Sequence, residues 1–206
     1  MNSFDARAKA WDTTKAIHRA KKVAEEMDGI FQECSFDNAL EYGCGTGLVG
    51  LNLRHRFENI TLMDSSAGMI DELNQKIINL DISNAKGVHH DLLLAEYQEK
   101  FDCIFSSMVM HHISDVGHVL SSFYEMLQDD GLICVVDLDA DNGQFHIEEA
   151  NFSGHNGFEH KEMEALLRNA GFEEIKIHTF YYGEKDLTER TIPYSLFCAS
   201  GIKRPK

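Results

Sequence analysis

The sequence predicts an α/β fold, a doubly wound Rossmann-like sheet that is mostly parallel and carries helices on both faces. Apolar runs with strand character alternate with segments of helical periodicity from about residue 36 onward, and this alternation is typical of a parallel sheet. A glycine-rich turn directly follows the first of these runs, at the place where open parallel sheets bind ligands. The length of 206 residues suits one domain that spans 1–206.

The alternating runs locate the individual elements. The expected strands lie at residues 36–42, 60–63, 85–89, 101–106, 132–137, 172–180 and 194–201. The expected helices lie at residues 12–28, 47–56, 67–80, 116–127 and 161–170. The residues between the last two strands are too few for a packed crossover helix, so these two strands are expected to pair antiparallel.

The charge balance restricts the partners of the chain. It has 19 Lys and Arg residues against 34 Asp and Glu residues, which gives a formal net charge of −15. Nucleic-acid binding needs a basic footprint, so nucleic acids and anionic membrane surfaces are not expected as partners. The sequence has no apolar run of about 18 residues, and residues 1–22 lack the apolar core of a signal peptide. The five cysteines show no metal-ligand spacing, which favours a reducing, cytoplasmic setting.

The strongest motif is the segment E-Y-G-C-G-T-G at residues 41–47. Its glycines allow the backbone to turn tightly beside a ligand, and the N-terminus of the following helix favours a negative group. Gly45-x-Gly47-x-x-Gly50 also fits a dinucleotide fingerprint, with Asp64 as its ribose-binding acid, so a nicotinamide- or flavin-dependent oxidoreductase is an alternative. The position of the glycines argues against this alternative. Gly43 directly follows the strand, whereas a pyrophosphate-binding turn that begins at Gly45 would start two residues too late.

Five segments, in order, resemble the motifs of class I S-adenosylmethionine (SAM)-dependent methyltransferases. These segments are residues 41–47, 63–70, 90–92, 101–113 and 154–172, and the similarity covers roughly residues 36–201. The resemblance implies a seven-stranded sheet with six parallel strands and an antiparallel last strand. It also implies SAM as the cofactor, S-adenosylhomocysteine as the product, and in-line transfer of the methyl group to a small-molecule acceptor.

The resemblance further implies a role for each motif. Glu41 would bind the ammonium of the cofactor, Asp64 both ribose hydroxyls, and Asp91 the adenine amine. The structural alternatives are a solvated strand end for Glu41 and helix N-caps for Asp64 and Asp91. Met69 suits the adenine face and a helical core stripe equally well. The implied cofactor-binding residues are Glu41, Gly43, Cys44, Gly45, Gly47, Asp64, Ser65, Met69, Asp91, Leu92 and Ser106.

His111 and His112 are the candidate catalytic bases. They follow the fourth expected strand at the ligand-binding edge of the sheet, and histidine titrates near neutral pH. The alternative is that they cap or pack near the cofactor without transferring a proton. No metal site is expected, because adjacent histidines in a strand point to opposite faces and no H-E-x-x-H or C-x-x-C motif occurs. The absence of a G-x-S-x-G elbow disfavours a hydrolase.

Two segments are expected to border the acceptor. The N-terminal helical part, residues 1–30, would cover the site, with Trp11 either facing the substrate or docking its own helix. The loop at 138–158, which contains His146 and His155, is long enough for a functional role and would line the acceptor pocket. The motifs indicate neither the acceptor, nor the atom that is methylated, nor the oligomeric state. A non-catalytic SAM-binding protein remains an alternative.

Overall fold

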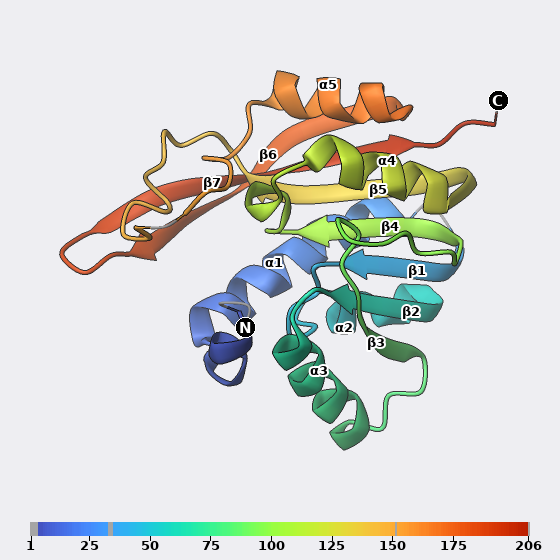
Figure 1. Cartoon of the computed structure of the whole chain (residues 1–206), viewed down its shortest axis with the longest axis horizontal. Helices are drawn as coiled ribbons and strands as arrows, with labels where there is room; N and C mark the ends of the chain where they lie inside the picture. The colour runs from blue at the N-terminus through green and yellow to red at the C-terminus, as the bar shows by residue number, and fades with distance from the viewer. Residues whose placement is uncertain (1–3, 33–34, 151, 206) are drawn as a thin grey trace.

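The computed structural model describes residues 4–32, 35–150 and 152–205, which form one mixed sheet with helices on both faces (Figure 1). The strands are β1 (Phe36–Tyr42), β2 (Phe57–Asp64), β3 (Ala85–His89), β4 (Phe101–Ser107), β5 (Leu127–Leu138), β6 (Glu173–Asp186) and β7 (Thr191–Ile202). The α-helices are α1 (Thr14–Phe31), α2 (Gly50–Leu53), α3 (Ala67–Asn79), α4 (Val116–Met126) and α5 (His160–Ala170). Short 3₁₀ helices are η1 (Asp5–Ala10), η2 (Arg54–Arg56) and η3 (Met110–His112).

The seven strands are arranged in the order β3-β2-β1-β4-β5-β7-β6. β7 runs antiparallel to its two neighbours, β5 and β6, and the other neighbouring pairs are parallel. This arrangement confirms the predicted fold class, including the antiparallel last strand.

Several predicted elements have different bounds in the structure, among them the second helix and the fifth strand. The helix expected over 47–56 is reduced to the short α2 followed by η2. Gly45 and Gly47 have left-handed φ angles of 53° and 81°, which a right-handed helix cannot include. β5 begins at Leu127 rather than at residue 132, because the exposed residues 128–130 form an irregular first part where the pairing with β4 shifts register.

Each face of the sheet has its own hydrophobic core. α1, α2 and α3 cover one face, where Met27, Leu53 and Leu73 are fully buried. α4 and α5 cover the other face through Phe123 and Leu167. The buried residues of α1 recur at helical spacing, so its apolar stripe packs on the sheet while its charged face stays in solvent.

The ligand-binding edge lies where the chain changes direction in the sheet. The chain goes from β1 to its neighbour β2 on one side, while β4 pairs with the other side of β1. Loops that leave the carboxyl ends of β1 and β4 therefore diverge and leave a crevice between them. The glycine turn after β1 and η3 after β4 both begin at this edge.

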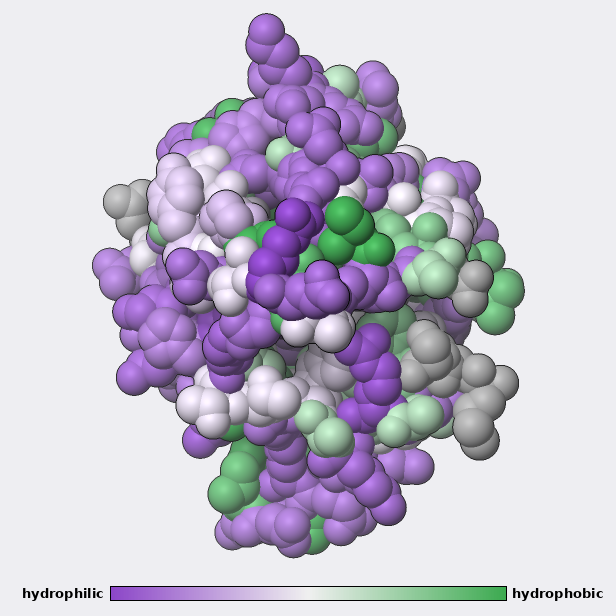
Figure 2. All heavy atoms as spheres, turned by 90° about the vertical axis from the view of Figure 1, so that its left-hand side faces the viewer, coloured by the Kyte–Doolittle hydropathy of each residue, from purple (hydrophilic) through white to green (hydrophobic). Residues whose placement is uncertain are grey.

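The β6–β7 hairpin extends beyond the rest of the sheet. Its strands pair from Glu173–Ile202 to Asp186–Thr191, whereas β5 stops pairing with β7 at Leu138–Leu196. The tip therefore projects from one end of the molecule (Figure 1). Viewed from that end, mostly hydrophilic residues cover the surface and hydrophobic residues form separate groups (Figure 2). Within the described residues, no helix is both long and apolar enough to span a bilayer.

Candidate active site

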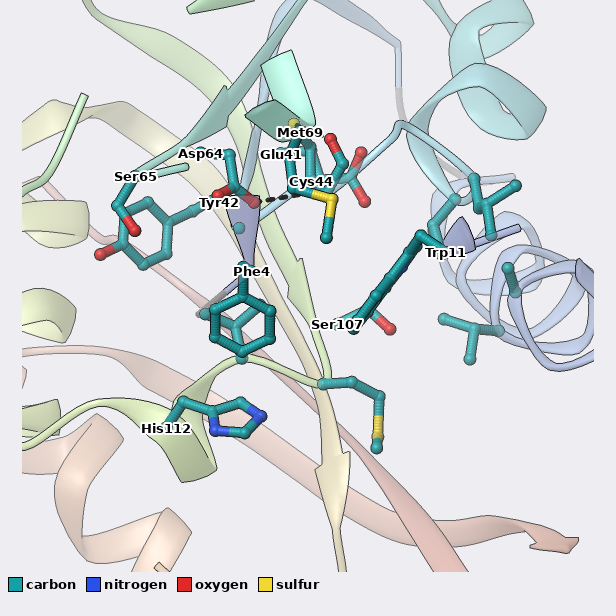
Figure 3. Close-up of a pocket in the computed structure, with 18 of the residues that line it drawn as sticks. Phe4, Trp11, Glu41, Tyr42, Cys44, Asp64, Ser65, Met69, Ser107 and His112 are labelled. Atoms are coloured by element: carbon teal, nitrogen blue, oxygen red, sulfur yellow. Dashed lines mark hydrogen bonds between the residues drawn. The ribbon is translucent and has the colours of Figure 1, made fainter. Parts of the chain in front are cut away.

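A cavity of about 360 Å³ opens at the carboxyl edge of the sheet. Residues from the glycine turn, from the ends of β1, β2 and β4, and from the N-terminal segment form its wall (Figure 3). Glu41, Cys44 and Asp64 lie together at one end, and Phe4 and His112 lie at the other. The cavity therefore has an acidic end and an aromatic end.

The glycine turn has a left-handed backbone at three positions, two of which line the cavity. Gly43 and Gly45 line the cavity, with φ angles of 70° and 53°. A Cβ on Gly43 would overlap the side chain of Val109. Gly47 does not line the cavity, since a Cβ there would lie 2.5 Å from Cδ1 of Leu73 on α3. The predicted ligand contact of Gly47 is therefore replaced by helix packing.

Asp64 connects the glycine turn to the start of α3. Its Oδ2 accepts a hydrogen bond from Gly45 N at 2.8 Å, and its Oδ1 accepts one from Ser66 N at 2.8 Å. Burial raises the pKa of the carboxyl, and these two backbone donors partly oppose the rise. Ser66 caps α3 by accepting from Met69 N at 3.3 Å, so Asp64 is not the helix cap. Each carboxylate oxygen keeps a free lone pair for a ligand in the cavity.

Glu41 is a buried carboxyl in the cavity wall, with 2% of its surface exposed. Its Oε2 accepts a hydrogen bond from Gly50 N at 3.0 Å, and a Cβ on Gly50 would overlap that oxygen. Burial raises the pKa of Glu41 to about 8. The carboxyl is therefore not the solvated strand end of the structural alternative, and a cation bound beside it would favour its ionised form.

Asp91 also lines the cavity, after β3. Its Oδ1 accepts a hydrogen bond from Leu93 N at 2.9 Å within a turn, so the carboxylate stabilises a turn rather than a helix N-terminus. The neighbouring Leu92, whose backbone is expected near the adenine ring, is 2% exposed and packs in the core under α4. Leu93 lines the cavity beside Asp91.

The aromatic end combines side chains from the N-terminal segment and from η3. The Phe4 ring lies 5.8 Å from the Trp11 ring and 5.3 Å from the His112 ring, both in edge-on contacts. Arg7 lies over Trp11 at 5.4 Å from the ring centroid. All three aromatic rings line the cavity, so Trp11 faces the site and not only its own helix.

Two aspartates fasten the N-terminal segment over the cavity. Asp5 accepts hydrogen bonds from Ser66 Oγ at 2.6 Å and from Gly68 N at 3.1 Å, at the N-terminus of α3. Asp12 accepts from Thr46 Oγ1 at 2.5 Å and pairs with Lys76. These contacts join the segment to the glycine turn and to α3, both of which border the acidic end.

The two candidate bases lie in different surroundings. His111 is 1% exposed and does not line the cavity, and its Nδ1 contacts Asp137 Oδ1 at 2.5 Å. His112 does line the cavity. Removal of its ring from water, together with charge repulsion from His111 and His146, lowers the pKa of His112 to about 3. Its imidazole is therefore neutral near pH 7 and is a weak base.

The sequence profile of a family described as "Methyltransferase domain" matches residues 13–190 of this chain. The chain belongs to the class I SAM-dependent methyltransferase family. The cofactor of this family is SAM, which agrees with the order of motifs around the cavity. An uncharacterized methyltransferase of Schizosaccharomyces pombe is 28% identical over 153 residues, which cover 67% of this chain and 54% of that protein.

Two further comparisons describe the range of the family. Malonyl-[acyl-carrier protein] O-methyltransferase 2 of Ilyobacter polytropus is 31% identical over 135 residues, which cover 64% of this chain and 50% of that protein. The chain thus spans about half the length of these curated relatives. Phosphoethanolamine N-methyltransferase 2 of Haemonchus contortus, solved with SAM, superimposes with a TM-score of 0.76 at 13% identity and covers 100% of this chain and 61% of that one. That likeness shows the methyltransferase fold.

Strand alternation moves one predicted cofactor contact by one residue. Ser106 is fully buried in β4, and its Oγ donates a hydrogen bond to Tyr42 O at 2.8 Å across the sheet. Ser107, the next residue, lines the cavity. Successive side chains of a strand point to opposite faces, so only one of the two serines can face the methyltransferase cavity. Of the other predicted residues, Cys44, Ser65 and Met69 line it, and Met69 is at the same time a buried core residue.

The loop between β5 and α5 lies behind the cavity rather than in its wall. None of the described residues of 138–158 lines the cavity, so His146 and His155, the predicted substrate contacts, lie outside its wall. His155 Nε2 lies 3.0 Å from Ile113 O, and His155 N donates to His111 O at 2.7 Å. The ring of His146 stacks on Phe152 at 3.7 Å. The loop therefore supports η3, which carries His112.

The same loop is fastened to the projecting β6–β7 hairpin. Thr188 N donates to Glu148 Oε1 at 2.7 Å, and Arg190 donates to Gln144 at 3.0 Å. Lys185 donates to Phe145 O and lies over the Phe145 ring. These contacts join segments that are far apart in sequence, so periodicity could not have located them.

Sequence reasoning missed several lining residues. Arg19 and Val23 of α1 line the cavity, as do Met108 and Val109 after β4. The α1 residues had no motif to mark them, because the direction of a helix face depends on how the helix packs. Val109 had a local signal, since it follows the β4 strand within the same family segment as the two histidines.

Proposed function

We propose that this chain transfers the methyl group of SAM to a small-molecule acceptor by in-line displacement. The observation that carries the proposal is the placement of Asp64 and Glu41 beside the glycine turn, at the acidic end of one cavity whose other end is aromatic. SAM has an ammonium and a sulfonium, and its ribose presents two hydroxyl donors. A wall with Glu41, Asp64 and Asp91 complements both features.

The cofactor would lie along the carboxyl edge with its sugar on Asp64 and its amino acid part toward Glu41. SAM supplies the activated methyl group, so the protein has to position the acceptor and exclude water. Phe4, Trp11 and His112 surround the opposite end and are suited to this task. The polar face of an acceptor could contact His112, while its apolar part packs on the rings.

The limited size of the cavity supports a small acceptor. Its volume of about 360 Å³ has to hold the cofactor as well as the reacting part of the acceptor. The fastened N-terminal segment narrows access further. A folded macromolecule would have to insert a single group past this segment.

The test is product formation. The purified chain is incubated with methyl-labelled SAM and a panel of amine, hydroxyl, thiol and carboxylate acceptors, and S-adenosylhomocysteine is measured by mass spectrometry. We expect one acceptor class to produce S-adenosylhomocysteine and methylated product in equal amounts. Calorimetry with SAM and with NAD is the matched control. Binding of NAD without SAM would overturn the proposal in favour of an oxidoreductase, and SAM binding without turnover across the panel would favour a non-catalytic role.

A further inference from the structure

Three histidines converge behind the aromatic end of the cavity. His111 and His112 come from η3, and His146 comes from the loop after β5. One ligand atom from each lies within 4.8 Å of the others. We propose that these three side chains bind one divalent first-row transition-metal ion, with zinc as the best match to three neutral nitrogen ligands.

The local backbone brings the two adjacent histidines together. The sequence-based argument against a metal assumed a strand, in which neighbouring side chains point to opposite faces. His111 and His112 instead lie in a 3₁₀ turn, and their ring centroids are 4.1 Å apart. The turn therefore removes the physical reason for excluding a shared ion.

Two of the histidines are oriented by carboxylates in the manner of metal ligands. His111 Nδ1 contacts Asp137 Oδ1 at 2.5 Å, and Asp137 is fully buried. His146 Nδ1 contacts Glu149 Oε1 at 2.9 Å. In both rings the carboxylate occupies Nδ1 and leaves Nε2 for another partner. Metal-binding histidines commonly pair their second nitrogen with a carboxylate, which fixes the tautomer and the ring orientation.

An independent observation points to a missing ligand at this place. Among the residues that the structure describes, none forms a hydrogen bond with the buried Nε2 of His146, a residue that is 7% exposed. Buried polar atoms in native structures nearly always have a partner, because water has been removed from them. An ion between the three rings would satisfy this nitrogen.

The geometry needs only a small adjustment to hold an ion. Zinc–nitrogen bonds of about 2.0–2.1 Å place tetrahedral ligands roughly 3.4 Å apart, whereas the ligand atoms here lie within 4.8 Å of one another. His111 and His146 are held by their carboxylates, whereas His112 lines the cavity and no hydrogen bond among the described residues fixes its ring. The adjustment is therefore assigned to His112.

The site would face the acceptor rather than the acidic end. Three protein ligands leave a zinc ion with an open position for water or substrate. Since His112 lines the cavity, that position would be reached from it. A hydroxyl or thiol acceptor bound there would lose its proton more readily. This consequence for the acceptor rests on the proposed methyl transfer, whereas metal binding itself does not.

The experiment uses untagged full-length protein that has been treated with a chelator and dialysed. Zn²⁺ is titrated in by calorimetry, and Co²⁺ is used as a visible absorption probe of coordination. The variants are His112→Ala, at the exposed ligand, and His146→Phe, which keeps a ring to stack on Phe152. The matched control is His178→Ala, which removes an exposed histidine of β6 that pairs with Glu26 of α1 at 2.8 Å and is not one of the three clustered histidines.

We expect wild type and His178→Ala to bind one equivalent of Zn²⁺ with the same affinity, and Co²⁺ to give the absorption of a low-coordinate nitrogen site. His112→Ala and His146→Phe should each weaken Zn²⁺ binding at least about tenfold. Absence of a one-equivalent site overturns the inference. Unchanged binding in the folded His112→Ala variant, or an equal loss in His178→Ala, does so too. SAM calorimetry on the same samples separates this result from the proposed function, because either ligand can bind without the other.

Discussion

Asp64 illustrates how one side chain both shapes the site and remains available to a ligand. Its two oxygens accept backbone hydrogen bonds from Gly45 and Ser66, which hold the glycine turn against the start of α3. A carboxylate can accept more than these two hydrogen bonds, and Asp64 lines the cavity. The hydrogen bonds and the burial together pre-orient the carboxylate before the cofactor arrives.

Replacement of this carboxylate should weaken cofactor binding selectively. Asp64→Asn keeps the shape of the side chain but removes its charge and one acceptor. A hydrogen bond to a charged group contributes about 1.5–3 kcal/mol, so SAM affinity in calorimetry should fall about 10- to 100-fold. Asp71→Asn, on the exposed part of α3, is the matched control and should bind like wild type. Equal affinities in both variants would contradict the ribose role.

Glu41 should make stability depend on pH in a defined direction. Burial raises its pKa from 4.5 in the ordinary state to about 8, so the folded protein retains a proton that the unfolded chain loses over this window. Its contribution to the free energy of unfolding is complete below about pH 4.5 and is lost as pH rises through about 8. Glu41→Gln carries no such proton. Its stability relative to wild type should therefore rise between pH 5 and pH 8, by about 1 kcal/mol per pH unit.

Urea unfolding without ligand at several pH values measures this difference. Titrating groups that do not interact with Glu41 change both proteins alike and cancel in the comparison, whereas Asp64 and Cys44 lie close enough to feel its charge. A stability difference between Glu41→Gln and wild type that is constant across the window would show that the carboxyl is not held neutral by burial.

At the scale of elements, the loop after β5 packs against η3 through one close contact between their backbones. His155 N donates to His111 O at 2.7 Å, and a Cβ on Gly154 would overlap the same carbonyl oxygen. The loop thus packs on η3 at a point where only a glycine fits. The position of His112 at the cavity depends indirectly on this contact.

Gly154→Ala should therefore destabilise the protein. Overpacking at such a contact costs about 1–3 kcal/mol, which for a chain of this size lowers Tm by about 2–4 °C per kcal/mol. Gly29→Ala is the control, since a Cβ on Gly29 in α1 meets nothing within 4 Å. It should leave Tm unchanged or raise it, because alanine favours a helix over glycine. Thermal unfolding of the two variants checks this, and equal Tm values would refute the close approach.

The N-terminal segment supplies a built-in reporter. Trp11 is the only tryptophan of the chain and lines the cavity. SAM binding should change the Trp11 emission with the dissociation constant found by calorimetry, because the sulfonium cofactor would displace water beside the indole. Asp12→Asn, which weakens the link to Thr46 and Lys76, should reduce both the amplitude and the affinity. Calorimetric binding without any change in emission would place Trp11 away from the cofactor.

For the whole molecule, the site joins elements that otherwise belong to different parts of the chain. The cavity wall takes residues from the N-terminal segment, from three strand ends and from the segment after β4. A ligand that contacts all of them in the folded state, and none in the unfolded chain, must stabilise the fold as a unit.

SAM should accordingly raise the Tm of the wild-type protein. At a concentration of 100 times Kd, the linkage contributes about 2.7 kcal/mol, which corresponds to about 5–10 °C for a chain of this length. NAD at the same concentration is the matched control and should cause no shift. Differential scanning fluorimetry measures both, and a rise with NAD alone would support the dinucleotide alternative.

The sequence predicted most of the fold because buried parallel strands are contiguous apolar runs. β1, β3 and α3 were located almost to the residue, since hydrophobic pattern and turn chemistry coincide there. α2 was overestimated because the left-handed conformation of Gly47 does not show in its periodicity. The hairpin was underestimated because the far end of β6 has no buried residue to mark it, and tertiary contacts with the loop after β5 hold the tip.

The primary structure by itself determined the family, the sheet and the acids that follow its strands, because these depend on local patterns that survive without knowledge of packing. Only the tertiary structure decided that Ser107 faces the cavity rather than Ser106, and that His112 lies in its wall while His111 is buried on Asp137. It also brought His146 to the other two histidines. Such relations depend on side-chain direction and on contacts between distant segments, which no local pattern specifies.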